Sequence, residues 1–263
     1  MTAHTPTWTR SAGSLAVQAF ATRTDLGRAA ALHTAEVIRH SVAQQGSARI
    51  IIATGNSQLP FVEELREIEH VPWGAVTVFH MDEYVGIPAQ HPASFRRWID
   101  ERIAVPFQPA AVHYIDGDNP DPEAEARRYE ELLRAAPLDL VCMGIGENGH
   151  IAFNEPYRAD FQDARWARII TLDEKSRKQQ VGEGHFPDVE SVPERAISLT
   201  VPALLAPSYI QVVAPERRKA EAVRATLSDE ISNACPATIL RTQEQSVLFL
   251  DEESASLLPA EQR

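Results

Sequence analysis

The sequence predicts an α/β protein built on a doubly wound, mostly parallel sheet with helices on both of its faces. Three observations lead to this fold class. Short apolar runs recur along the 263-residue chain, segments with helical spacing separate them, and the runs are continuously apolar, without alternation of polar and apolar residues. Continuous apolar runs are typical of strands buried on both faces, and strands that alternate with helices form parallel sheets.

The first half of the chain already shows this alternation. Apolar residues recur at helical spacing over 24–45, and Gly46 follows as a suitable C-cap. The run at 48–53 predicts a buried strand, and 59–68 predicts the helix after it. We expect the pattern to continue with strands at 75–79 and 112–115 and with helices at 92–103 and 122–135.

The second half repeats the pattern with longer interruptions. Residues 138–143 form the clearest buried strand. Further strands are predicted at 167–172, 209–213 and 246–250, with a helix at 215–227. The segments near 154–168 and 179–194 are polar and weakly periodic. We interpret them as lid segments of one domain spanning 1–263, because ligands of doubly wound sheets bind beyond the carboxyl ends of the strands.

Composition and charge exclude several classes of partner. Hydrophobic residues make up 44% of the chain and charged residues 24%, which is typical of a folded domain and not of a disordered one. The formal net charge of −12 argues against nucleic acid or an anionic membrane as a partner. An anionic substrate would therefore need a locally positive site.

Cysteine usage and apolar runs predict the compartment. The two cysteines, Cys142 and Cys235, fit a reducing environment better than a disulfide framework. Residues 1–14 lack the apolar core of a signal peptide, and no apolar run reaches the roughly 18 residues that span a bilayer. We expect a cytoplasmic protein.

A glycine-rich loop follows the strand at 138–143. Gly144, Gly146 and Gly149 match the dinucleotide-binding pattern G-x-G-x-x-G. Pro156 comes too soon after them for the long helix that would hold a pyrophosphate, so we expect no nicotinamide cofactor. The same loop suits acid–base chemistry, because His150 can exchange a proton near neutral pH. The alternative is a histidine that only caps a turn.

Carboxylates accompany this histidine. Asp82 and Glu83 follow the strand at 75–79, and their side chains would project into the same crevice as the His150 loop. A carboxylate there can abstract a proton next to a carbonyl group. Glu155 and Asn148 are close enough to His150 in sequence to orient it or to share a proton path. For the acidic pair, the alternative is an ordinary surface turn.

Two further segments are candidates for binding an anion. Residues 54–57 join a strand to a helix start, where backbone N–H groups can cradle a phosphate. The helix expected at 215–227 begins with Arg217, Arg218 and Lys219. Cations in a first helical turn interact unfavourably with the helix dipole, so their presence there is more easily explained if they bind an anion. The alternative is solvated surface charge.

Two long motifs resemble those of the glucosamine-6-phosphate deaminases. They read MDEYVG at 81–86, followed by HPASF at 91–95, and GIGENGHIAFNEP at 144–156. The resemblance extends from about residue 50 to about residue 250. It implies a Rossmann-like fold shared with the 6-phosphogluconolactonases, no metal and no organic cofactor. It also implies an enzyme of amino-sugar metabolism that converts glucosamine 6-phosphate to fructose 6-phosphate and ammonia.

The resemblance also implies a role for each matching residue. Asp82 corresponds to the base that moves a proton between C2 and C1 of the sugar. His150 corresponds to the residue that assists ring opening, with Glu155 and Asn148 as its supports. The phosphate-binding positions correspond to Gly55, Asn56, Ser57 and Lys219.

Several positions depart from the family pattern around the phosphate. Gln58 replaces the proline of the phosphate loop, and Gly182 stands where most deaminases carry a lid arginine. Arg177 or Lys178 is the expected replacement for that arginine, and Glu83 is a further site candidate. Because these changes concern substrate binding and not proton transfer, galactosamine 6-phosphate stays open as an alternative substrate.

Two other functions compete with an amino-sugar phosphate deaminase. A 6-phosphogluconolactonase would share the fold, but Asp82 in MDEY and Glu155 in FNEP argue against it. A sensor that binds sugar phosphate without catalysis would need no base. The expected partner is a small sugar phosphate, and a homo-oligomer is neither required nor excluded. The decisive expectation is that Asp82 and His150 face one shared cavity.

Overall fold

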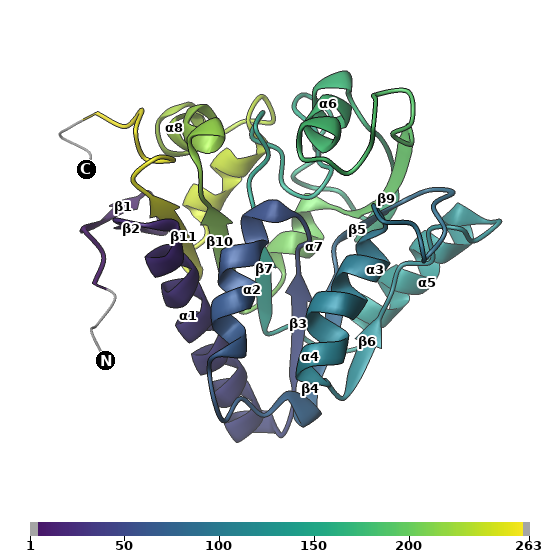
Figure 1. Cartoon of the computed structure of the whole chain (residues 1–263), viewed down its shortest axis with the longest axis horizontal. Coiled ribbons are helices and arrows are strands. Elements are labelled where there is room, and N and C mark those ends of the chain that lie inside the picture. The colour runs from purple at the N-terminus through teal and green to yellow at the C-terminus, as the bar shows by residue number, and fades with distance from the viewer. Residues whose placement is uncertain (1–4, 260–263) are drawn as a thin grey trace.

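A computed structural model describes residues 5–259 of the chain (Figure 1). The first four residues of the stretch 1–14, and the ends of the predicted domain 1–263, lie outside the described residues. Within 5–259, no helix is long and apolar enough to cross a membrane.

The main sheet has eight strands in the order β1-β2-β11-β10-β7-β3-β4-β6. Their bounds, in that order, are Trp8–Ala12, Leu15–Phe20, Ser246–Asp251, Tyr209–Ala214, Leu140–Met143, Ala48–Ile52, Val76–His80 and Ala111–His113. Every neighbouring pair is parallel except β1 and β2, which form an antiparallel hairpin. The predicted mostly parallel sheet is therefore confirmed.

Helices cover both faces of this sheet. Successive side chains of a strand point to opposite faces, so Ile51 and its neighbour Ile52 belong to two different apolar cores. The core around Ile51 includes side chains of α5 (Pro122–Arg134) and α8 (Ala220–Ser228). The core around Ile52 includes side chains of α1 (Arg23–Gln45), α2 (Leu59–Arg66) and α3 (Phe95–Ile99). Both cores confirm the doubly wound architecture.

The strand order reverses between β3 and β7. From β3 the chain continues outward to β4 and β6, whereas β7 begins the other half of the sheet through β10 and β11. The loops after two adjacent parallel strands diverge at such a point and leave a crevice at the carboxyl ends. The sequence motifs 54–57 and 144–150 are the loops that follow β3 and β7.

A second, three-stranded antiparallel sheet lies beside the main one, in the order β5-β9-β8. Its strands are β5 (Asp82–Tyr84), β9 (Arg195–Leu199) and β8 (Ala167–Thr171). Helix α6 (Glu174–Gly182) follows β8, and α7 (Val201–Leu205) follows β9. Figure 1 shows α6 and α8 at the top of the molecule. The loops that follow the carboxyl ends of the parallel strands lie at the same end.

Several sequence predictions about single elements were wrong. The strand at 167–172 belongs to the small antiparallel sheet and not to the parallel one, and β1, β2, β5 and β9 were not predicted. The helix expected from 92 begins only at Phe95, because the side chain of Ser94 caps it, and it continues as a π-helical turn, Asp100–Ala104, and as α4 (Val105–Phe107). The predicted lid at 179–194 overlaps the second half of α6.

The remaining elements are short 3₁₀ helices. Their bounds are Asn56–Gln58 for η1, Trp73–Ala75 for η2, Arg217–Lys219 for η4 and Pro236–Thr242 for η5. The positive φ of 79° at Glu216 separates β10 from η4, so the helix predicted from 215 starts later and only becomes α-helical at Ala220.

Candidate active site

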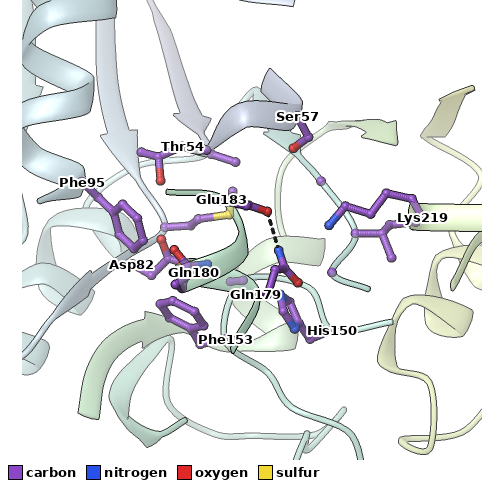
Figure 2. A pocket seen from close by; sticks show the side chains of 17 residues that line it. Thr54, Ser57, Asp82, Phe95, His150, Phe153, Gln179, Gln180, Glu183 and Lys219 are labelled. Atoms are coloured by element: carbon purple, nitrogen blue, oxygen red, sulfur yellow. Dashed lines mark hydrogen bonds between the residues drawn. The ribbon is translucent and has the colours of Figure 1, made fainter. Parts of the chain in front are cut away.

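One cavity lies at the carboxyl ends of the parallel strands (Figure 2). It is lined by the loops after β3, β4, β7 and β10, together with residues of α6. Asp82 and His150 both line it, so the expectation that they share a cavity is confirmed. Figure 2 shows the Lys219 and Ser57 side chains on one side of this space and Asp82 on the other.

Asp82 is the first residue of β5, and its side chain is buried at the cavity wall. His80 holds its backbone, since the Nδ1 atom of His80 lies 2.9 Å from the carbonyl oxygen of Asp82. The backbone N–H of Ile115 donates to Nε2 of His80 at 2.8 Å, so the ring proton is on Nδ1. Burial lowers the pKa of His80 to about 3, which keeps this ring neutral. Asp82 therefore has a fixed position.

The electrostatic surroundings of Asp82 favour its protonated form. Burial, followed by the nearby charge of Glu83, raises the pKa of Asp82 from 3.8 to about 8. A carboxyl group with a pKa near neutrality can both accept and return a proton under ordinary conditions. This is the property that a general base needs when it moves a proton within one substrate.

Glu83 does not line the cavity, contrary to the expectation that its side chain would project into it beside Asp82. Its carboxylate instead closes the amino end of α3. The oxygens accept hydrogen bonds from Ser94 Oγ at 2.7 Å and from the backbone N–H groups of Tyr84 and Arg96, each at 2.9 Å. A fourth hydrogen bond comes from the backbone N–H of Phe95. Because all four donors belong to the turn and the helix start, the carboxylate oxygens of Glu83 point toward them and away from the cavity.

His150 stands on the glycine-rich loop, packed against Gly146. A Cβ atom added at Gly146 would lie 2.3 Å from the imidazole ring, so only glycine allows this approach. The Nδ1 atom of the ring lies 3.2 Å from Ser176 Oγ and 3.7 Å from Glu155 Oε2. These partners favour a proton on Nδ1 and leave Nε2 available to a substrate.

Glu155 and Asn148 lie behind His150 and do not line the cavity. The side-chain amide of Asn148 donates to Glu155 Oε2 at 3.0 Å. Burial opposes ionisation of Glu155, but hydrogen bonding and charge attraction from His150 lower its pKa to about 2. Glu155 is thus a permanent carboxylate beside the imidazole, which stabilises the ring whenever it takes up a second proton.

The opposite end of the cavity suits an anion. Gly55 adopts a φ of 98°, a conformation that favours glycine, and Ser57 and Lys219 line the cavity with it. The Lys219 side chain is 3% exposed, and burial lowers its pKa to about 8. Asn56 does not line the cavity, and its side chain donates to the backbone oxygen of Glu183, so only its backbone N–H is left for the predicted phosphate contact.

The lid cations predicted from sequence are absent from this end. Arg177 donates to the backbone oxygen of Val189 at 2.5 Å, and Lys178 pairs with Glu174 at 2.5 Å. Neither side chain lines the cavity. The predicted compensation by Arg177 or Lys178 is therefore wrong in this structure.

Helix α6 and Glu183, the residue directly after it, instead contribute uncharged and acidic side chains that the sequence did not indicate. Gln179, Gln180 and Glu183 line the cavity, and Ser176 contacts His150 from the first turn. The only signal for them was a polar segment without periodicity. Such a pattern is compatible with a solvated loop, so it could not single out these residues.

The geometry of the glycine-rich loop and of the cavity residues can be compared with two other kinds of site. After Gly149 the chain forms a short bridge between Ile151 and Asn154 and not a helix, so the site lacks the helix amino terminus of a dinucleotide-binding loop. In the described part of the chain, no group of three or more His, Cys, Asp or Glu side chains is placed to hold a metal ion.

Comparison with known proteins decides the family. Residues 21–249 match the model of the family described as glucosamine-6-phosphate isomerases/6-phosphogluconolactonase. This chain belongs to that family. A glucosamine-6-phosphate deaminase from Exiguobacterium sibiricum is 38% identical over 86% of this chain and 86% of its own length. Glucosamine-6-phosphate deaminase 1 from Bacillus subtilis is 31% identical over 89% of this chain and 96% of its own.

Solved structures of the glucosamine-6-phosphate isomerase/6-phosphogluconolactonase family share the fold. A monomeric glucosamine-6-phosphate deaminase superimposes with a TM-score of 0.83 at 31% identity, covering 92% of this chain and 99% of that one. A 6-phosphogluconolactonase from Shewanella baltica has a TM-score of 0.73 at 20% identity, covering 92% of this chain and 100% of that one. The second likeness shows the fold alone.

Proposed function

We propose that this protein is a glucosamine-6-phosphate deaminase, which converts glucosamine 6-phosphate and water to fructose 6-phosphate and ammonia. One observation carries the proposal: a buried carboxyl group, Asp82, shares a cavity with His150, whose ring contacts Glu155 behind it, while Lys219 stands at the opposite end. The deaminases among its relatives, 31–38% identical over most of the chain, support the same activity.

Binding comes first in the proposed mechanism. The substrate phosphate binds at Lys219, Ser57 and the backbone that follows Gly55. This anchor holds the sugar in one register, so that binding free energy is used to orient C1 and C2 toward Asp82. The net charge of −12 makes this local positive end necessary for an anionic substrate.

Ring opening and proton transfer follow. Nε2 of His150 accepts the proton of the C1 hydroxyl and returns it to the ring oxygen, which opens the pyranose. The carboxylate of Glu155 stabilises the transient imidazolium. Asp82, in its ionised form, then takes the C2 proton while one proton of the substrate's ammonium group passes to O1, which produces an enolamine. The protonated Asp82 delivers its proton to C1, which produces a protonated C2 imine. Water hydrolyses the imine and releases ammonia with the ketose phosphate.

The setting of the enzyme is part of the proposal. We infer that it acts in the cytoplasm as one α/β domain, with the segments near 154–168 and 179–194 as its lids. Both cysteines, Cys142 and Cys235, are buried and unpaired, which suits a reducing compartment. Galactosamine 6-phosphate is the second candidate substrate, because the site departs from the common family pattern at the phosphate end and not at the base.

An ammonia-coupled assay tests the activity. Glucosamine 6-phosphate, galactosamine 6-phosphate and 6-phosphogluconolactone are supplied separately. We expect more ammonia from glucosamine 6-phosphate than from galactosamine 6-phosphate, and no acid release from the lactone.

Asp82→Asn is expected to lower kcat at least about 100-fold while sparing substrate binding. The control Asp160→Asn changes an exposed aspartate outside the cavity. Full activity of D82N, or lactone hydrolysis without ammonia release, would reject the proposal.

A further inference from the structure

A carboxylate occupies the anion-binding end of the cavity. Glu183 follows the last turn of α6, and its side chain is 7% exposed. It lines the same cavity as Lys219, and Gln179 Nε2 donates to its Oε1 at 2.9 Å (Figure 2). Burial opposes its ionisation, but His185, Arg218 and Lys219 lower its pKa to about 2, so it is charged.

The shortest side-chain contact of Glu183 is with Arg218, whose Nη1 atom lies 2.7 Å from Glu183 Oε1. Arg218 also contacts Glu216 at 2.6 Å and Glu147 at 3.4 Å. Arg218 lines a neighbouring hollow and not the cavity itself, whereas Glu183 lines both. The Glu183 carboxylate therefore stands between the Arg218 guanidinium and the space in which an anion would bind.

This arrangement conflicts with a bound phosphate unless Glu183 moves. A sugar phosphate carries close to two negative charges at neutral pH, and a buried carboxylate beside it would repel it strongly. The positive charge of Lys219 attracts Glu183 and would attract a phosphate in the same way. The two anions are therefore alternatives for one position.

We propose that Glu183 is an internal competitor of the substrate phosphate, and that its displacement makes Arg218 the second phosphate-binding cation of the site. This inference rests on the proposed function, because it concerns the phosphate of the same substrate. It assigns to Arg218 the task for which the sequence suggested Arg177. The chain then binds phosphate with two adjacent residues, Arg218 and Lys219, and with no cation from the lid.

Binding of inorganic sulfate, measured by calorimetry at pH 6.5, tests the competition. Sulfate keeps two charges at this pH, and Lys219 stays protonated below its pKa of about 8. E183Q is expected to bind sulfate at least about tenfold more tightly than the wild type and to show a lower KM for glucosamine 6-phosphate. E183A removes the same charge by truncating the side chain, and we expect it to raise the affinity for sulfate as well. The matched control, E216Q, removes a carboxylate from the same arginine outside the cavity, and we expect less than about threefold change.

A second substitution tests the assignment of Arg218. R218M in the E183Q background is expected to remove the gain in sulfate affinity, whereas R217M, in the same turn but directed at Ser256, leaves it unchanged. Equal or weaker sulfate binding by E183Q, or an unchanged gain in the presence of R218M, would overturn the inference. If ammonia release persists in that case, the proposed function stands without it. Loss of the proposed function would appear differently, as wild-type protein that releases no ammonia from any amino-sugar phosphate.

Discussion

At the scale of single residues, the site depends on two groups whose burial moves their pKa values toward each other. The pKa of Asp82 is raised to about 8, and the pKa of Lys219 is lowered to about 8. Asp82 must be ionised to accept the C2 proton, whereas Lys219 must be protonated to attract phosphate. Both conditions hold together only in a narrow range of pH.

We therefore expect a bell-shaped dependence of kcat/KM on pH with its maximum near pH 8. The acidic limb falls as pH decreases because Asp82 takes up a proton, and the alkaline limb falls as pH increases because Lys219 loses one. Lys219→Arg, which stays charged, should abolish the alkaline limb and leave the acidic limb unchanged. Steady-state assays between pH 6 and pH 10 measure both limbs. A profile that is flat through pH 8 would contradict the two assignments.

The residues of the cavity that were predicted correctly from the sequence all belong to the motifs shared with the family. Asp82, His150, Gly55, Ser57 and Lys219 all line it. Glu83 and Asn56 do not, because each is drawn away by hydrogen bonds to neighbouring backbone. Residue type and position along the chain cannot show which of two adjacent side chains faces a cavity, since that depends on the local twist of the backbone and on competing donors.

At the scale of elements, the small antiparallel sheet links the base to the lid. Asp82 lies on β5 and pairs with Ser198 of β9, and β9 pairs with β8, which leads into α6. The backbone ladder therefore joins the strand that carries the carboxyl group to the helix that covers it.

Glu83 offers a test at this scale, because it ties β5 to the start of α3. Glu83→Ala leaves buried donors without an acceptor, and we expect a loss of about 2–4 kcal/mol in the free energy of unfolding, which lowers Tm by at least about 4 °C. Glu83→Gln keeps most of the packing but removes the charge that helps to raise the pKa of Asp82. It should move the acidic limb of the pH profile to lower pH. A purely structural role would leave that limb in place.

The sequence predicted strands correctly where the hydrophobic runs were long. It did not predict which strands pair with which. The buried strands at 48–53 and 138–143 were recognised from their apolar runs. The strand at 167–172 was recognised as a strand but assigned to the wrong sheet, because an apolar run does not specify its partner. Strand β5 has three residues and begins with two acids, so no pattern indicated it.

At the scale of the whole molecule, the topology brings the functional loops together. The reversal of strand order between β3 and β7 was not itself predicted, but the alternation of strands and helices was sufficient to place the ligand at the carboxyl ends of the strands. The geometry of α6 over that end was beyond sequence reasoning, since it follows from packing around Phe153 and Phe186 in a separate small core.

A bound substrate should stabilise the whole fold, because its binding site is assembled from both halves of the sheet. We use the reduced, open-chain analogue of glucosamine 6-phosphate, which lacks the carbonyl and cannot react. At about 100 times its Kd the expected stabilisation is about 2.7 kcal/mol, or a rise in Tm of roughly 5–10 °C. Thermal unfolding monitored by circular dichroism measures the shift. At the same ligand concentration, an equal rise with an analogue that lacks the phosphate would contradict the anchoring role of Lys219.

The path of the chain between β7 and β10 has a consequence for engineering. Residues 144–208 form one uninterrupted excursion from the main sheet, and this excursion carries His150, Glu155 and all of α6, whereas Asp82 and Lys219 lie outside it. Both flanking strands are neighbours in the sheet. The excursion contacts β5 by backbone pairing with β9 and by packing of Phe153 and Phe186 on Tyr84, so a graft must keep these aromatic partners. Residues 144–208 are therefore a suitable segment for exchange between relatives. Replacing them with the corresponding segment of a relative would change the His150 side of the site, while the recipient keeps its own proton-abstracting carboxyl group, Asp82.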